Sequence, residues 1–210
     1  MESKGKKNVG QPSQIFIVCA MNDQRNMPKR DAKGKIIKKK KGVPDAKSLY
    51  PSEHRDALER LFHWFDNKFR PYTVHLQQLI PKAFNSQNKK EQLEDLRKSV
   101  DIDMDLIHTS LKVFDKQMAQ KKFACGDHIT IFDIMFFNEL SQVLFLRNKY
   151  LKKVDPDANA DLDENSELMS YEHINKWYTR TMPQDETFPK IQAVDADLRE
   201  SFLKTIESLN

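Results

Sequence analysis

Glycine and cysteine are scarce in this chain, whose 210 residues include five glycines and two cysteines. Folds with many tight β-turns need glycine wherever the backbone takes a positive φ, so the scarcity favours a helical protein. Cys19 and Cys125 are too few for a disulfide framework, and neither belongs to a C-x-x-C pair with metal or redox spacing. We therefore expect a protein of a reducing compartment.

Long apolar runs are missing as well. The longest, Ile15 to Met21 and Ile131 to Phe137, fall far short of the roughly 20 residues that span a bilayer. The N-terminus lacks the apolar core of a secretory signal and has no arginine before Arg25, unlike an Arg-rich transit peptide. We expect no membrane span and a cytoplasmic location, with mitochondrial import by an atypical signal or association with the cytoskeleton as alternatives.

The residue patterns of known catalytic and cofactor sites are not found. The six histidines show no zinc-binding spacing, the serines no nucleophile-elbow context and the glycines no phosphate-binding loop. Cys125 lies several residues before the helix start expected at Thr130, too far for that helix to activate its thiol, and is interpreted as a buried packing residue. The sequence therefore predicts no catalytic residue, no cofactor and no metal.

Charge is distributed unevenly along the chain. Residues 1–46 hold 12 Lys and Arg against 4 Asp and Glu, a net charge of +8, whereas residues 47–210 hold 23 against 27, a net charge of −4. We interpret residues 1–46 as an extended basic arm with at most one short strand, at residues 14–21, and residues 47–210 as the folded body. The candidate partner-binding residues of the arm are Lys29, Arg30, Lys33, Lys35, Lys38, Lys39, Lys40 and Lys41.

Four interpretations of this arm stay open: a nuclear address, a phosphate-binding arm, a dock for an acidic protein surface, or a solvated tail. No Phe, Tyr or Trp lies between Lys29 and Lys41, so the arm offers no platform on which bases could stack. Sequence-selective binding of single-stranded RNA is therefore disfavoured, whereas non-specific binding of nucleic acid remains an alternative.

The body shows apolar residues every three or four positions, which predicts amphipathic helices. A first helix starts at Ser52 and is expected to end or kink at Pro71, a long helix covers residues 90–118, and two more cover residues 173–182 and 187–209. Ile134 to Leu146 is apolar on most of its circumference, as in a helix buried among neighbours. Asp101, Asp103 and Asp105 are interpreted as a solvated face of the long helix. We expect an all-α antiparallel bundle.

Two sequence patterns, a capping box and a hydrophobic staple, predict the same helix start. In the stretch FACGDHITIFDIMFFNEL, Thr130 can accept from the backbone N–H of Asp133 while the Asp133 carboxylate reaches back to the N–H of Thr130, a reciprocal capping box. Ile129 and Ile134 are spaced to form a hydrophobic staple across the same cap. Loss of the Asp133 side chain is expected to cost about 0.5 to 2 kcal/mol of stability.

This capped helix resembles the second core helix of the glutathione transferase C-terminal domain. The entry LYPSEHRDALERLFHWFDNKFRP, the long helix, the capping segment and the later EHINKWYTRT follow in the order of that family, so the resemblance to its theta-like members covers about residues 48–210. It implies an all-helical domain whose capped helix nucleates folding. In the family, glutathione is held by a thioredoxin-like N-terminal domain of some 80 residues. The 46 residues upstream of the body are too few for its parallel-strand crossovers, so we expect that domain to be lacking.

An acidic insert at about residues 149–170 departs from the family pattern. Its oxygen-bearing residues have the spacing of a calcium loop, but Ala160 stands where that loop needs glycine and Ser166 where it needs a bidentate glutamate. We therefore expect a solvated loop, with only a weak calcium-like pattern formed by Asp155, Asp157, Asn159, Asp161 and Asp163.

These observations lead to one functional hypothesis and two alternatives. The hypothesis is a non-catalytic structural module, an accessory subunit or scaffold of a larger assembly that docks through its basic arm on a protein partner with an acidic surface. The alternatives are a theta-like glutathione transferase acting on electrophiles and a translation-associated module of synthetase or elongation-factor complexes. The identity of the partner and the oligomeric state stay open.

Overall fold

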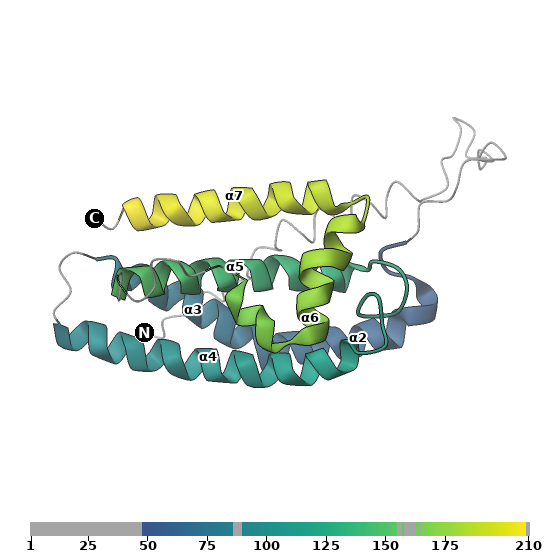
Figure 1. The fold of residues 1–210 in the computed structure, drawn as a ribbon, viewed down its shortest axis with the longest axis horizontal. Helices are drawn as coiled ribbons and strands as arrows, with labels where there is room; N and C mark the ends of the chain where they lie inside the picture. Colours follow the sequence, from purple (N-terminus) through teal and green to yellow (C-terminus); the bar gives the residue numbers. More distant parts are fainter. Residues whose placement is uncertain (1–47, 86–89, 155–156, 158–162, 164, 209–210) are drawn as a thin grey trace, which may run out of the picture. The chain divides into compact units, whose positions relative to one another are not determined.

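The computed structural model describes residues 48–85, 90–154, 157, 163 and 165–208. The chain divides into two units, Met1–Pro51 and Ser52–Asn210. Of the first unit only residues 48–51 are described, where the N–H of Tyr50 donates to Ser48 Oγ at 3.1 Å. In the described part of the second unit every regular element is a helix, which confirms the all-α fold class (Figure 1). The predicted basic arm lies outside the described residues.

The first helices of the body form one continuous helical stretch. A 3₁₀ turn, η1 (Ser52–His54), leads into α2 (Arg55–Trp64), a π-helical turn η2 (Phe65–Phe69) and then α3 (Arg70–Ala83). Pro71 does not end the helix, because it lies in the first turn of α3, where its missing N–H is not needed. The N–H of Arg70 donates to the carbonyl of Phe65, which is the hydrogen-bond pattern of a π turn. The helix therefore continues past Pro71 through this turn, where we expected it to end or kink.

The long helix α4 (Lys90–Met118) covers the residues expected from its periodicity. It packs against α3 and, near its C-terminal half, against α6 (Glu172–Lys176). The interpretation of its three alternating aspartates as one solvated face was wrong for Asp103, which is buried and lies 2.6 Å from Nδ1 of His75 on α3. The two neighbouring aspartates are exposed, because side chains two positions apart point to different sides of a helix.

The helix α5 (Ile131–Val154) is the most buried element of the body. It contacts α3 on one side and α7 (Phe188–Glu207) on another, and in Figure 1 it runs between α4 and α7. Two hydrogen bonds join α7 to it: Arg199 donates to Ser141 Oγ at 2.7 Å, and Gln142 donates to Asp195 at 2.9 Å. Arg199 and Asp195 also form an ion pair with each other within α7. The all-round apolar pattern of α5 therefore marks a central helix, as expected.

Aromatic rings form the centre of this core. Phe136 of α5 lies 4.6 Å from Phe114 of α4 and 5.6 Å from Trp177, measured between ring centroids. Edge-to-face and offset contacts of this kind each add about 0.5 to 1.5 kcal/mol beyond the burial of apolar area. The core thus joins helices that are far apart in the sequence.

Two irregular turns connect α6 to α7. Ser166–Ser170 forms the 3₁₀ turn η3 before α6, which continues into the π turn η4 (Trp177–Thr181) and the 3₁₀ turn η5 (Met182–Gln184). The expected helix over residues 173–182 is therefore helical throughout but changes its winding twice. Trp177 and Met182 of these two turns lie in the core, as does Leu168 of η3, and each is at most 2% exposed.

Candidate functional site

Asp133, the acidic residue of the predicted cap, is fully buried at the start of α5. Its carboxylate accepts hydrogen bonds from the backbone N–H of Thr130 at 2.9 Å, the hydroxyl of Thr130 at 2.6 Å and the backbone N–H of Ala124 at 2.9 Å. The first bond is the one proposed from the sequence. The Thr130 hydroxyl, however, is seen donating to the carboxylate, where the capping box would have it accept from the N–H of Asp133.

The bond from Ala124 was not foreseen, because it comes from a turn nine residues upstream of Asp133. That turn is closed by the N–H of Phe123 donating to the carbonyl of Gly126 at 2.7 Å and by the reverse bond at 3.1 Å. Gly126 has φ 135°, a backbone conformation that residues with a Cβ rarely adopt. Asp133 therefore fixes both the start of α5 and the turn before it. Of the two staple residues, Ile129 is buried and Ile134 half-buried.

Burial raises the pKa of Asp133, and the hydrogen bonds from Ala124 and Thr130 oppose this effect by favouring the ionised form. The indole N–H of Trp177 makes no hydrogen bond of normal geometry, yet it is near enough to act on Asp133 in the same direction as those bonds. This group is thus a structural carboxyl, enclosed by donors that the fold provides.

Cys125, next to that turn, is a buried and unreactive thiol. Burial, helped by the nearby Asp133 carboxylate, raises its pKa to about 11, and the cations Lys121 and Arg60 offset this only in part. Because the thiolate is the nucleophilic form, a pKa this high leaves the sulfur protonated at neutral pH. The expected packing role of Cys125 agrees with its burial.

A groove runs along α2, and we call it the α2 groove. It consists of two adjoining hollows that share Arg60 and Trp64. The larger hollow has a volume of about 670 Å³, within the range of ligand and peptide sites. The larger hollow is lined by Asp56, Glu59, Arg60, His63, Trp64, Asn67 and Lys68, and the smaller by Ala57, Arg60, Leu61, Trp64, Gln117, Lys121 and Ala124.

Trp64 is a half-buried aromatic residue in this groove, and ring stacking orders its side chain. Its indole stacks on Phe114 of α4 at 5.1 Å and on Phe69 of η2 at 5.8 Å, with interplanar angles of 15° and 21°. Both phenylalanines are buried, so the indole lies against the core while part of it remains accessible. The π turn η2 follows Trp64 directly, and its residues Phe65 and Phe69 are both buried in the core. The spacing of apolar residues did not indicate that part of Trp64 stays accessible.

The two hollows differ in their charges. In the larger one, cationic Arg60 and Lys68 lie near Asp56 and Glu59, and Glu59 is bound to Arg55 at 3.0 Å. The lining of the smaller hollow holds Arg60 and Lys121 and no acidic residue among its described members. Lys121 Nζ donates to the carbonyl of Ala124 at 3.3 Å, and Ala124 is the residue that Asp133 anchors. The buried cap therefore also positions one wall of the α2 groove.

A polar network joins three other elements. Glu167 of η3 pairs with Arg147 of α5 and lies 3.3 Å from His108 of α4, whose Nδ1 is 2.5 Å from the hydroxyl of Tyr171. Burial alone would raise the pKa of Glu167, but His108 and Arg147 outweigh it and the pKa is lowered. Burial and the nearby carboxylates raise the pKa of Tyr171 to about 12, which keeps its hydroxyl protonated. This network holds the η3 turn against the long helix.

Several residues proposed from the sequence lie outside the described part of the chain. They include the eight basic residues of the arm, from Lys29 to Lys41, and most of the calcium-like loop. Of that loop, Asp157 and Asp163 are exposed, and Asp163 accepts from the backbone N–H of Asn165 at 3.0 Å. Within the described residues no group of three His, Cys, Asp or Glu is arranged to hold a metal ion. Among those same residues, no helix has the length and apolarity to cross a bilayer.

The family model of the glutathione S-transferase C-terminal domain matches residues 12–185. The chain belongs to this family. The match starts within the segment that we interpreted as the arm, earlier than the resemblance over residues 48–210, and it ends before α7. No curated protein and no solved structure matches the chain at a significant level. The family includes both glutathione transferases and modules without catalytic activity, so membership alone decides the fold and not the activity.

Proposed function

We propose that this glutathione S-transferase C-terminal-like domain is a non-catalytic protein-interaction module, an accessory subunit whose α2 groove receives an extended or helical segment of a protein partner. The observation that carries the proposal is the pair of adjoining hollows on either side of Trp64 and Arg60. Tryptophan and arginine are both enriched at the energetic centres of protein interfaces.

The stacking of Trp64 on core residues supports a role in binding. Its indole is already stacked on Phe114 and Phe69, so a partner would not have to immobilise it. An interface side chain that is ordered in advance avoids roughly 0.5 to 1.5 kcal/mol of entropic cost. An apolar or aromatic side chain of the partner would cover the exposed part of the indole in the larger hollow.

The cations of the smaller hollow set a second requirement for the partner segment that binds the groove. Arg60 and Lys121 share this lining with the apolar Ala57, Leu61 and Ala124, with Trp64 and with the polar Gln117. A carboxylate of the partner could pair with both cations while its neighbouring methylene groups pack on the apolar residues. The segment that fits best therefore combines an apolar anchor with an acidic residue, which agrees with the acidic partner expected from the basic arm.

Neither the described thiol nor Tyr171 is an activated nucleophile. Burial raises the pKa of Cys125 to about 11 and the pKa of Tyr171 to about 12, so both groups stay protonated at neutral pH. Conjugation of glutathione to chlorodinitrobenzene by the full chain, saturable in both substrates, would overturn this part of the proposal.

A peptide-display selection on the full chain tests the groove itself. We expect the enriched sequences to pair an aromatic or large aliphatic residue with Asp or Glu within about one helical turn. Trp64→Ala should weaken the binding of a selected peptide at least tenfold, and Arg60→Glu should weaken the binding of acidic peptides more than that of their Asn or Gln counterparts.

Met169→Ala is the matched control, because this side chain is 72% exposed and is not part of the groove. It should leave the affinity unchanged. Selected peptides that are basic, or whose affinity does not respond to Trp64→Ala, would contradict the proposal.

A further inference from the structure

The smaller hollow of the α2 groove holds two cations that have no acidic partner. Arg60 and Lys121 line it, and none of its other lining residues in the described part of the chain is acidic. Among the described residues Arg60 forms no ion pair, and the hydrogen bond of Lys121 Nζ, at 3.3 Å, goes to the neutral carbonyl of Ala124. Arg55, which lies on the same helix as Arg60, is by contrast paired with Glu59 at 3.0 Å. The smaller hollow therefore carries two uncompensated positive charges.

The two cations come from different elements and lie close to the same point. Arg60 belongs to α2, whereas Lys121 belongs to the turn that follows α4. Both act on the buried thiol of Cys125 and lower its pKa, although burial and the Asp133 carboxylate outweigh them. Two like charges held near one another repel, so an anion bound between them is attracted by both.

The buried Asp133 carboxylate does not use these two cations. It accepts hydrogen bonds from the backbone N–H groups of Thr130 and Ala124 and from the Thr130 hydroxyl. Burial raises its pKa, and these hydrogen-bond donors, rather than Arg60 or Lys121, oppose that rise. The charges of the smaller hollow are therefore available to a ligand.

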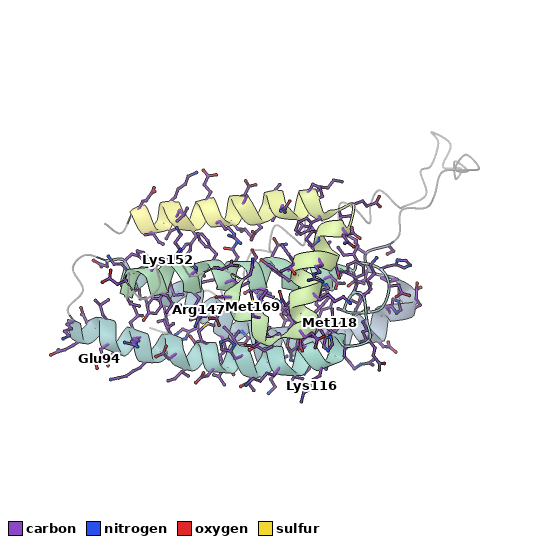
Figure 2. The ribbon with its side chains drawn as sticks, in the orientation of Figure 1. Glu94, Lys116, Met118, Arg147, Lys152 and Met169 are labelled. Carbon is purple, nitrogen blue, oxygen red and sulfur yellow. The ribbon has the colours of Figure 1, made fainter. Side chains whose placement is uncertain are left out.

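The wall that carries Lys121 is held in place by the backbone. The N–H of Lys121 donates to the carbonyl of Met118 at 3.0 Å, and the N–H of Ala124 donates to Asp133 at 2.9 Å. Figure 2 shows Met118 near the C-terminal end of α4, the end beside which Figure 1 shows α2. The opposite wall is one face of α2, where lining residues recur every three or four positions: Ala57, Arg60, Leu61 and Trp64.

We propose that the smaller hollow receives a phosphorylated side chain of the partner, so that phosphorylation of the partner controls its binding to the α2 groove. The inference rests on the proposed function of that groove and specifies the residue beside the apolar anchor. A phosphorylated serine or threonine carries a charge of about −1.5 to −2 at neutral pH and has three acceptor oxygens. Two cations without an acidic neighbour match that charge, whereas a carboxylate compensates only one of them.

The donors of the hollow suit a phosphate group. The planar guanidinium of Arg60 can donate two parallel hydrogen bonds to two phosphate oxygens, and Lys121 Nζ has further N–H groups for the third. The side-chain amide of Gln117 adds a neutral donor to the same lining. Trp64 lines both hollows, so an apolar residue within about one helical turn of the phosphorylated one would pack on the indole.

The surrounding charges favour a single phosphate over a nucleic acid. Asp56 and Glu59 line the adjoining larger hollow, and residues 47–210 have a net charge of −4. A polynucleotide would carry its next phosphates onto these carboxylates, and nucleic-acid binding depends on many cations along the backbone. One isolated phosphate with an apolar neighbour avoids this repulsion.

Matched peptide libraries test the proposal on the full chain. The probes are short synthetic peptides that are degenerate around one fixed phosphoserine, and the same libraries with Ser or Asp at that position. For the best binders, isothermal titration should give an affinity at least about tenfold higher for the phosphoserine form than for the Ser form. The Asp form should bind with intermediate affinity.

Charge-removing variants locate the phosphate. Arg60→Met and Lys121→Gln should each reduce the preference for phosphoserine over Ser to less than about threefold, because each removes one of the two charges. Lys121→Gln keeps an N–H donor for the carbonyl of Ala124, so it separates loss of charge from loosening of the turn. Lys122→Gln is the matched control, since Lys122 is exposed and adjacent but does not line the hollow, and it should leave the preference unchanged. Trp64→Ala should weaken the phosphoserine and Ser forms by the same factor.

The outcomes separate this inference from the proposed function. Peptides that need Trp64 but bind equally well with phosphoserine and with Ser would overturn the phosphate site and leave the groove as a partner site. A phosphate preference that Lys122→Gln lowers as much as Lys121→Gln would overturn it as well, because the attraction would then be general. Single-stranded RNA that displaces the phosphopeptide at equal concentration would contradict the choice of a phosphoprotein. Absence of any Trp64-dependent peptide binding would contradict the proposed function itself.

Discussion

Replacing Asp133 with alanine should destabilise the helical body more than the loss of an ordinary helix cap. The side chain accepts three hydrogen bonds, two of them from the buried backbone N–H groups of Thr130 and Ala124. Without it, both N–H groups are left buried without a partner, at about 1 to 3 kcal/mol each. Part of this cost is offset, because burial already disfavours the ionised carboxyl and raises its pKa.

The balance of these effects gives an expected loss of about 2 to 4 kcal/mol, above the 0.5 to 2 kcal/mol of a cap alone. For a domain of this size the melting midpoint should fall by roughly 5 to 12 °C. Urea unfolding followed by circular dichroism measures the free energy of unfolding directly, and Asp127→Ala serves as control because Asp127 is an exposed aspartate of the preceding turn.

The same substitution should also loosen the turn that carries Ala124, a lining residue of the α2 groove. Peptide binding to the groove is therefore expected to weaken in Asp133→Ala even at temperatures where the body stays folded. A free energy of unfolding within 0.5 kcal/mol of the Asp127→Ala control would refute the role assigned to Asp133.

Three further predictions concern the rest of the body. Gly126→Ala should cost about 1 to 3 kcal/mol in urea unfolding, entirely through backbone strain at φ 135°, because the nearest atom to an added Cβ is His54 Nε2 at 3.8 Å. His75→Ala should cost about 1 to 3 kcal/mol by leaving the buried Asp103 carboxyl without its partner, and the loss should be measurable at pH 7 as a lower urea midpoint. Burial raises the pKa of Glu139 above its ordinary value of 4.5, so the folded state holds its proton more tightly than the unfolded state. The stability from this group is therefore complete below pH 4.5 and is lost as pH rises through the folded pKa, and in thermal melts Glu139→Gln should abolish that part of the pH dependence.

Much of the helical fold was predictable because it follows from periodicity. The bounds of α4 coincide with the range 90–118 predicted from apolar residues spaced three or four positions apart, and the all-round apolar pattern of α5 marked it as the central helix. In both cases the signal is local, since a helix places every third or fourth residue on one face.

The details that the sequence left hidden depend on contacts between distant segments. Asp103 looked like one of three solvated aspartates until His75 of α3 was placed beside it, 28 positions away. Pro71 is a strong local signal for a helix end, yet the π turn at Phe65–Phe69 accommodates it. The exposed part of Trp64 follows from that same turn, and no pattern in the sequence distinguishes it from the buried aromatics around it.

The measurement that tests the proposed function most directly is hydroxyl-radical footprinting of the full chain with and without a saturating acidic-aromatic peptide. Oxidation of Trp64 should fall strongly when the peptide is bound, whereas oxidation of the exposed Met169 should stay constant. Unchanged oxidation of Trp64 at full occupancy would show that the peptide binds elsewhere and would contradict the assignment of the α2 groove as the partner site.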